Sequence, residues 1–157
     1  MYNFLARAFL GRKVARLNQG NPEAILGMTA EDVVFRFPGR NSWASQFRPT
    51  ELTRCFRPTH IGRAEFETFL RRYVASGIQM EIEDLMVSGP PWKARMAAKV
   101  HVWSLAPDGA DRYRNRAVIW IDTRWGRIRR QEDFEDTESA AAFDRLLESL
   151  GPSQTMA

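Results

Sequence analysis

The chain has 157 residues, 44% of them hydrophobic and 27% charged, and its formal net charge is +4. This size and balance are typical of one globular domain with a sizeable core. The single cysteine, Cys55, excludes an internal disulfide and a cysteine-rich zinc site. No apolar run approaches the ~20 residues of a membrane span, and no signal peptide cleavage site follows the first residues, so we expect a cytoplasmic protein without a membrane partner.

Nearly all of the positive charge is arginine. Basic proteins can bind nucleic acid or acidic ligands. Here the basic residues are dispersed among acidic ones, apart from an excess between residues 36 and 72, and no recognised RNA- or DNA-binding motif is present. We therefore expect no nucleic acid partner.

The first half of the chain predicts three helices and one strand. Residues 3–17 carry apolar side chains at helical spacing. An Asn-Pro-Glu sequence at residues 21–23 predicts the start of a short helix, with the asparagine as its cap. Residues 32–37 predict a strand that a Pro-Gly pair ends. Residues 62–76 predict the clearest amphipathic helix of the chain.

The segment 40–61 is the least regular part of the sequence. It contains Trp43, Phe47 and Phe56 together with prolines and arginines. One interpretation is a short irregular helix and turns that pack the aromatic rings into the core. The other is a mobile lid, because long irregular loops in compact domains often cover binding sites.

After Gly77 the pattern changes from helical to alternating periodicity. A Trp-Gly turn at residues 125–126 joins the last two of four predicted strands, because glycine accepts backbone angles that other residues avoid. Thr137 is the predicted cap of a closing helix. One domain over residues 1–150 and a flexible tail over 151–157 are expected. The four strands of the predicted antiparallel meander are residues 78–87, 92–105, 112–123 and 127–136.

This order of elements predicts an α+β fold, a cone-shaped curved antiparallel sheet with helices on one side. Such a sheet encloses a cavity, which is the default ligand site. So few helices leave the other face uncovered, and an exposed apolar face usually marks an interface. We therefore expect a small apolar ligand in the cavity and a homodimer through the open face.

Four segments resemble the SnoaL-like polyketide cyclase branch of the nuclear transport factor 2-like superfamily, which has a cystatin-like fold. The resemblance covers roughly residues 18–147 and implies a homodimer with a ligand pocket. The superfamily includes cyclases, isomerases, epoxide hydrolases, dehydratases and noncatalytic binding proteins, so the fold does not select a reaction. The segments are EDVVFRFPG at 31–39, HIGRAEFETFL at 60–70, RYRNRAVIWIDTRWGRI at 112–128 and DFEDT at 133–137.

Two known chemistries can be matched through this resemblance. A ketosteroid isomerase-like site would place its base at Phe37 and its acid at Val118, and neither side chain transfers a proton. A limonene epoxide hydrolase-like site would place its charged residues at Lys99, His101 and Asp133. Asp133 matches the aspartate of that family's final strand, and Lys99 keeps the positive charge of its arginine. His101, however, replaces an aspartate.

The resulting hypothesis makes His101 an acid/base, Asp133 its orienter or a second acid/base, and Lys99 a stabiliser of a developing oxyanion. Residues two apart on a strand share a face, so Asp133 is expected to share its face with Gln131 and Glu135. The alternative is that His101 is a half-buried hydrogen-bonded residue and that Asp133 forms a salt bridge with Arg129 or Arg114. The expected walls of the ligand site are Phe37, Trp43, Trp103, Asn115, Val118, Trp120 and Gln131.

No cofactor is expected, and two distant histidines without matched carboxylates predict no metal site. Three functional classes remain open. The first is an acid/base enzyme of the cyclase, isomerase or hydrolase type that acts on a small apolar cyclic or carbonyl compound. The second is a noncatalytic small-molecule-binding module, and the third is a dimeric interaction protein.

Overall fold

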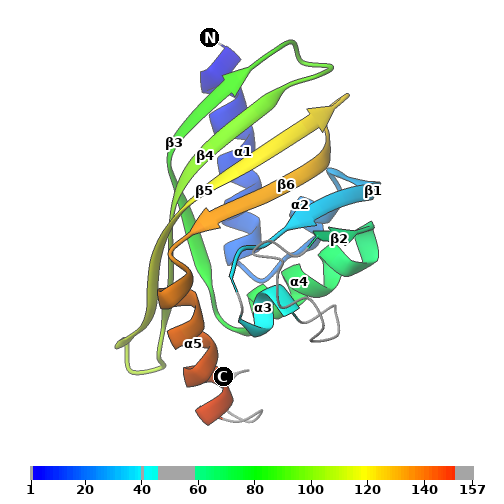
Figure 1. Ribbon diagram of the computed structural model, residues 1–157. Coiled ribbons are helices and arrows are strands. Elements are labelled where there is room, and N and C mark those ends of the chain that lie inside the picture. Colours follow the sequence, from blue (N-terminus) through cyan, green and yellow to red (C-terminus); the bar gives the residue numbers. More distant parts are fainter. Residues whose placement is uncertain (1, 40, 46–58, 151–157) are drawn as a thin grey trace.

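The computed structural model describes residues 2–39, 41–45 and 59–150 (Figure 1). It confirms the predicted α+β fold with a curved sheet. The expected tail at 151–157 lies outside the described residues. The elements are α1 (Tyr2–Asn18), α2 (Glu23–Leu26), β1 (Thr29–Arg36), α3 (Ser42–Ser45), β2 (Thr59–Ile61), α4 (Arg63–Ala75), β3 (Gln79–Ser88), β4 (Arg95–Leu105), β5 (Asp111–Arg124), β6 (Arg127–Glu135) and α5 (Thr137–Leu150).

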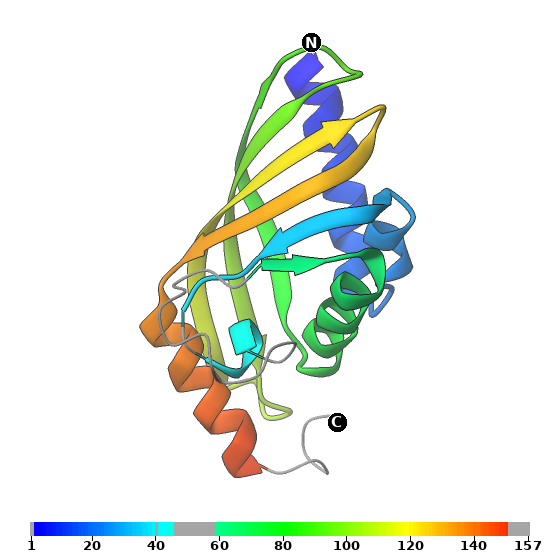
Figure 2. The same cartoon turned by 45° about the vertical axis from the view of Figure 1, so that its right-hand side comes forward.

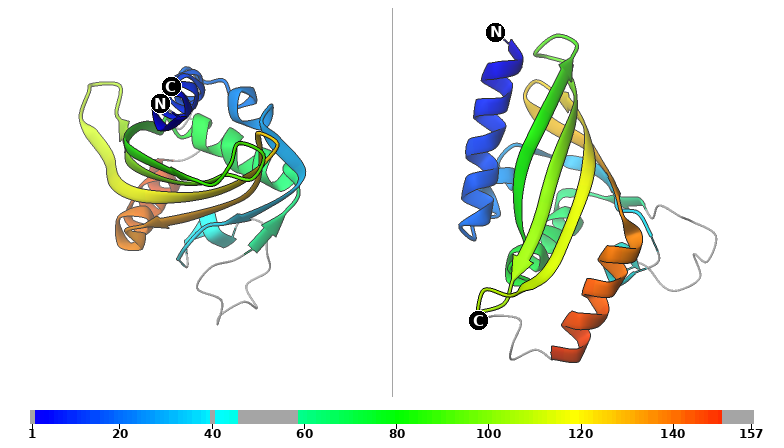
Figure 3. Two further views of the ribbon diagram at one scale, coloured as in Figure 1. Left: turned by 90° about the horizontal axis from the view of Figure 1, so that it is seen from above. Right: turned by 90° about the vertical axis from the view of Figure 1, so that its left-hand side faces the viewer.

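The sheet has six strands in the order β2-β1-β6-β5-β4-β3. All neighbours are antiparallel except β1 and β6, which run parallel. The sheet curls strongly, and Figures 2 and 3 show α1 and α4 within its concave side. Helix α1 packs on β3, α4 on β1 and α5 on β5. The helices therefore close one side of a cone, as predicted.

Alternating burial in the meander follows directly from the sequence. On β5, the buried side chains from Tyr113 to Thr123 are at odd positions, and most of the residues between them are exposed. Successive side chains on a strand point to opposite faces, so the odd positions line the core. The turn before β6 has positive φ at both Trp125 and Gly126, which is the geometry that two-residue hairpin turns favour.

Three local predictions need correction. The strand β2 was not predicted, because three residues are too few to show a period. The cap of α5 is Asp136 and not Thr137, since Oδ1 of Asp136 accepts hydrogen bonds from the backbone N–H groups of Glu138 at 2.9 Å and Ser139 at 3.3 Å. The N-cap position of α2 is occupied by Pro22, without a side-chain cap.

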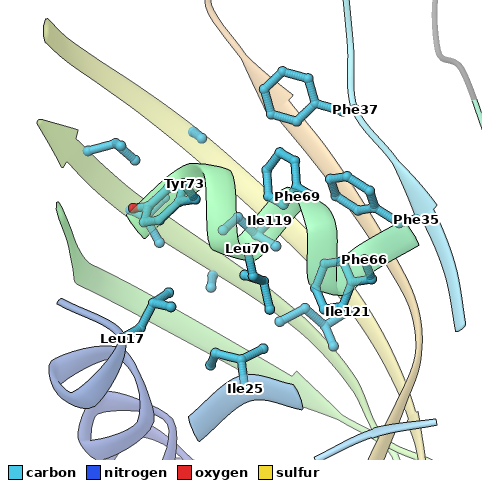
Figure 4. Packing of buried hydrophobic residues seen from close by; sticks show 14 of the residues in the cluster. Leu17, Ile25, Phe35, Phe37, Phe66, Phe69, Leu70, Tyr73, Ile119 and Ile121 are labelled. Carbon is cyan, nitrogen blue, oxygen red and sulfur yellow. The ribbon is translucent and has the colours of Figure 1, made fainter. Parts of the chain in front are cut away.

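The core joins the aromatic face of α4 to the sheet (Figure 4). The ring centroids of Phe35 and Phe69 lie 4.5 Å apart, and those of Phe35 and Phe66 lie 5.2 Å apart. Trp43 of α3 is buried against Phe69, which favours the packing interpretation for that ring. Phe47 and Phe56 lie outside the described residues, so the choice between lid and core remains open for them. No described helix is both long and apolar enough to cross a membrane.

Candidate functional site

A cavity of about 100 Å³ lies between the concave face of the sheet and helices α1, α4 and α5. Its walls are mostly aliphatic and aromatic. Apart from the indole of Trp43, the polar groups of its described lining belong to five residues. These residues are Tyr73 of α4, Tyr113 of β5, and Gln131, Asp133 and Glu135 of β6.

A bulge in β6 aims these three β6 side chains inward. Ile128 pairs with Thr123 of β5, whereas Arg130 pairs with Asp122, so β6 has one extra residue at Arg129. An extra residue exchanges the two faces of a strand for every position after it. Ile128 therefore faces the core at an even position, and the inward residues after the bulge are at odd positions.

Asp133 is a buried carboxyl group that has no positively charged partner among the described residues. Its side chain is 6% exposed, and its Oδ1 accepts a hydrogen bond of 3.0 Å from Nε2 of Gln131. Burial raises the pKa of Asp133 to about 7, against the smaller lowering effect of the Gln131 hydrogen bond. Desolvation disfavours the charged form of a carboxyl group, and one neutral amide does not offset it.

The arginines proposed as partners of Asp133 are bound elsewhere. Arg129 forms an ion pair with Asp32 of β1. Nε of Arg114 lies 2.7 Å from Oδ2 of Asp111 at the start of β5. The predicted pairing of Asp133 with Arg129 or Arg114 is therefore wrong.

Glu135 is the second carboxyl group of the cavity. Burial, followed by the negative charges of Asp133 and Asp136, raises the pKa of Glu135 to about 8, while a hydrogen bond with Tyr113 opposes the rise. Nδ2 of Asn115 donates to the Tyr113 hydroxyl at 2.9 Å. The hydroxyl of Tyr113 therefore accepts from Asn115 and donates to Glu135. Burial also raises the pKa of Tyr113, which keeps it a phenol at neutral pH.

Tyr73 contributes a hydroxyl group from α4, on the helix that crosses the sheet (Figure 4). The residue is 7% exposed, and its hydroxyl has no hydrogen-bond partner among the described residues. Burial, and then the charges of Tyr113, Asp133 and Glu135, raise its pKa well above the usual value. Tyr73 therefore lines the same cavity as the two carboxyl groups, and its hydroxyl forms no hydrogen bond with them.

The predicted site residues divide between the two faces of the sheet. Asp133, Gln131, Phe37 and Trp43 line the cavity. Asn115 is buried beside it and holds Tyr113. The residues on the outer face or its edges are Lys99, His101, Trp103, Val118 and Trp120.

The predicted encounter of His101 with Asp133 is therefore wrong. On β4 the inward residues are at even positions, such as Val100, which faces the core opposite Ala117 of β5. The odd positions of β4 face outward, whereas the bulge turns the odd positions of β6 inward. The His101 ring instead stacks on the ring of Trp103, and the two ring centroids lie 5.2 Å apart.

Lys99, Val118 and Trp120 also lie away from the cavity. Nζ of Lys99 lies 3.0 Å from Oε2 of Glu83. Val118 is 41% exposed and Trp120 is 38% exposed. None of these three side chains lines the cavity, so the predictions that Lys99 stabilises an oxyanion and that Val118 and Trp120 form walls of the ligand site are wrong.

Sequence reasoning missed Tyr73 and gave no role to Glu135, and it left open whether Tyr113 points into the cavity or supports the end of its strand. Alternation from Asp133 placed Glu135 on its face, and the same alternation along β5 could have found Tyr113. Tyr73 is at a core position of an amphipathic helix, where its hydroxyl gave no separate signal. Among the described residues, no group of three or more His, Cys, Asp or Glu side chains could hold a metal ion.

The amino-acid sequence matches the model of a known domain family. The SnoaL-like domain model matches residues 10–131. The chain belongs to the SnoaL-like family. This SnoaL-like domain has no significant match among curated proteins.

Solved structures show the same fold at low sequence identity. A protein provisionally assigned as a polyketide cyclase from Xanthomonas campestris is 21% identical, with a TM-score of 0.57 over 90% of this chain and 99% of that one. A provisional ketosteroid isomerase from Kribbella flavida is 22% identical, with a TM-score of 0.56 over 83% and 76%. SalBIII, an epoxide hydrolase/cyclase-like enzyme of pyran ring formation in salinomycin, is 17% identical, with a TM-score of 0.59 over 88% and 97%. These identities show a nuclear transport factor 2-like fold alone.

Two carboxyl groups in this cavity can divide acid and base roles. Like charges disfavour ionisation of both groups in a dry site, so the pair retains a proton in the neutral pH range. One carboxyl group can then accept a proton while the other donates one. The cavity of this SnoaL-like domain therefore has the groups that proton transfer requires.

Proposed function

We propose that this SnoaL-like domain is an acid/base enzyme that acts on a small apolar cyclic or carbonyl compound held in the cone. The observation that carries the proposal is the placement of Asp133 and Glu135 inside a mostly apolar cavity, where burial raises both pKa values toward neutrality. Perturbed carboxyl groups in a cavity are typical of active sites.

The two acids take different roles because their neighbours differ. Asp133, with the lower pKa, is the base and removes a proton from the bound molecule. Glu135, with the higher pKa, is the acid and delivers a proton to an oxygen of the same molecule. Gln131 orients the first group and Tyr113 the second. Proton transfer of this kind typically contributes ~10²–10⁴-fold in rate and needs no cofactor.

The volume limits the size of the substrate. An engineered protein cavity of ~150 Å³ holds one benzene molecule. The cavity of about 100 Å³ therefore suits a molecule of about one small ring in the conformation described. A substrate of this size would be almost fully removed from water, which strengthens its interactions with the carboxyl groups.

A hydrogen–deuterium exchange experiment tests the proposal. Cyclopentanone is incubated with the protein in D₂O, and proton NMR follows the loss of the hydrogens next to the carbonyl. We expect protein-dependent exchange that Asp133→Asn slows by at least about 10²-fold, because the amide cannot accept the proton. The control Asp108→Asn makes the same chemical change in an exposed turn and should leave the rate unchanged.

A noncatalytic binding module is the second candidate, favoured by the mostly apolar wall and the unpartnered Tyr73 hydroxyl. In that case cyclopentanone binds without exchange, and Asp133→Asn changes neither binding nor exchange. Saturation-transfer NMR on the same samples measures the binding. Exchange at the rate of free cyclopentanone in a sample that shows binding would contradict the enzyme and support the module.

A further inference from the structure

We propose that the molecule held in the cone carries a protonated amino group, and that this ammonium lies between Asp133, Glu135 and the hydroxyl of Tyr73. The inference rests on the proposed function, because it assumes that the cavity is the ligand site. It adds the chemical class of the ligand's polar group.

The charges of the cavity are of one sign. Its described lining contains two carboxyl groups and no lysine, arginine or histidine. Neighbouring cations on β6 are bound on the other side of the sheet, since Nη2 of Arg130 lies 2.7 Å from Oε2 of Glu132 and Arg129 pairs with Asp32. The described lining therefore has no countercharge that would stabilise an ionised carboxyl group at this site, and a cationic ligand would supply it.

The hydrogen-bonding capacity of the site also matches an ammonium group. An ammonium has three N–H donors and no acceptor. The Tyr73 hydroxyl is without a partner among the described residues, and so is Oε1 of Glu135. Among the described residues, the carboxyl group of Asp133 accepts one hydrogen bond, from Gln131. Two carboxyl groups and one phenol oxygen thus offer acceptors for the three donors.

Aromatic rings surround the remaining volume. Phe37, Trp43, Phe69 and Tyr113 belong to the lining, together with aliphatic side chains of β4 and β5. Aromatic faces attract cations, and the attraction increases when water is excluded. The same walls suit the apolar body of the ligand. In the described part of the lining, a carboxylate ligand would instead meet two acids and no positive charge.

Three ligands of one shape test the inference. Cyclopentylamine, cyclopentanol and cyclopentanecarboxylate share one ring and differ in the charge of a single group. Isothermal titration calorimetry at about pH 8 compares their binding to the full chain. We expect the amine to bind at least about tenfold more tightly than the alcohol, and the carboxylate more weakly than both, because charge-assisted hydrogen bonds are the stronger ones.

Proton release gives an independent measurement. At about pH 6 Asp133 holds its proton in the free protein, and an adjacent ammonium would displace it. Titrations in phosphate and in MES buffer should therefore show release of up to about one proton with the amine and none with the alcohol. Equal heats in the two buffers with the amine would contradict the placement beside Asp133.

Matched variants locate the ammonium. Asp133→Asn and Glu135→Gln keep the shape of the side chains and should each reduce the preference for the amine over the alcohol several-fold. Tyr73→Phe removes only the unpartnered hydroxyl and should weaken the amine more than the alcohol. Asp108→Asn should change neither.

The possible failures are distinguishable. If the alcohol binds as tightly as the amine, the ammonium inference is overturned and the proposed acid/base function stands. If none of the three ligands binds and cyclopentanone neither binds nor exchanges, the cavity is not a ligand site and both proposals fail.

Discussion

Nε2 of Gln131 donates a hydrogen bond to Oδ1 of Asp133 at 3.0 Å, between two buried side chains on the inner face of β6. This neutral donor is the contact that replaces a salt bridge for Asp133. The carboxyl group therefore remains under the influence of burial, which raises its pKa from 3.8 to about 7. The protonated form is favoured in the folded state, and this preference connects the site to the stability of the fold.

The first prediction concerns stability and pH. Because the folded pKa of Asp133 is raised above the unfolded value, the folded state binds more protons between about pH 4 and pH 7. The free energy of unfolding should therefore fall as pH rises through that window, by about 4 kcal/mol for this group. Glu135 extends the fall to about pH 8. Urea unfolding at about pH 4 and pH 8 measures the difference.

The same experiment on a variant isolates Asp133. Asp133→Asn should flatten the pH dependence and stabilise the protein at about pH 8, because a neutral amide has no charge to desolvate. Asp108→Asn, in an exposed turn, should keep the wild-type dependence. If the variant loses as much stability between the two pH values as the wild type does, Asp133 does not titrate in this window.

The second prediction concerns the support of Tyr113. Nδ2 of Asn115 donates to the Tyr113 hydroxyl and to the backbone carbonyl of Asp136, both at 2.9 Å. Asn115→Ala removes both bonds in a buried place and should destabilise the protein by about 1–3 kcal/mol. Chemical unfolding measures the change, with the exposed substitution Gln19→Ala as the control. A loss no larger than that of the control would contradict the role of Asn115.

The third prediction concerns the cluster that holds Trp43 at the cavity. The guanidinium of Arg72 lies 3.9 Å from the centre of the Trp43 ring, and Nη2 of Arg72 lies 3.2 Å from Oδ1 of Asp144 on α5. Asp144 also accepts a hydrogen bond of 2.8 Å from the backbone N–H of Ser42. Asp144→Ala removes the carboxylate that Arg72 and the Ser42 amide share and should cost about 2–4 kcal/mol in thermal or urea unfolding.

A matched variant tests whether burial is the reason for that cost. Asp32→Ala breaks the exposed ion pair with Arg129 on the outer face. Exposed pairs contribute about 1 kcal/mol or less, so this variant should be much milder. Equal losses for the two substitutions would show that the Asp144 cluster does not act as a buried network.

The fourth prediction concerns assembly, and we propose a homodimer through the outer face of the sheet. Val118, Trp120, Phe134 and Met86 are exposed there, with exposed fractions of 41%, 38%, 40% and 66%. Val118 pairs directly with Phe134 across β5 and β6, so the patch is continuous at its centre. Contiguous apolar surface of this kind typically marks an interface.

Sedimentation velocity at micromolar concentration tests the dimer. The wild type should sediment as a dimer, and Trp120→Glu should sediment as a monomer, because it places a charge in an apolar contact. Leu105→Glu makes a similar change at an exposed residue near the end of β4 and should remain dimeric. A monomeric wild type would overturn the proposal.

The sequence alone determined the architecture of this protein. The apolar residues of α4 recur with the period of a helix, and those of β3 to β6 alternate as in strands. Each pattern shows which side chains are buried, and it can be read from the sequence of that element alone. Alternation also predicted that Gln131, Asp133 and Glu135 share a face. It could not show β2, because pairing with β1 and not a sequence pattern makes that short segment a strand.

Only the tertiary structure decided which face of each strand meets the cavity. The outward position of His101 depends on how β4 pairs with β5, and the inward position of Asp133 depends on the bulge at Arg129. A shift of one residue in the pairing exchanges the two faces of a strand. The residue pattern of a single strand predicts neither its pairing partner nor such a shift. Tyr73 joins the site for a similar reason, since packing of α4 against the sheet, and not its own sequence, places it in the lining of the cavity with the two acids.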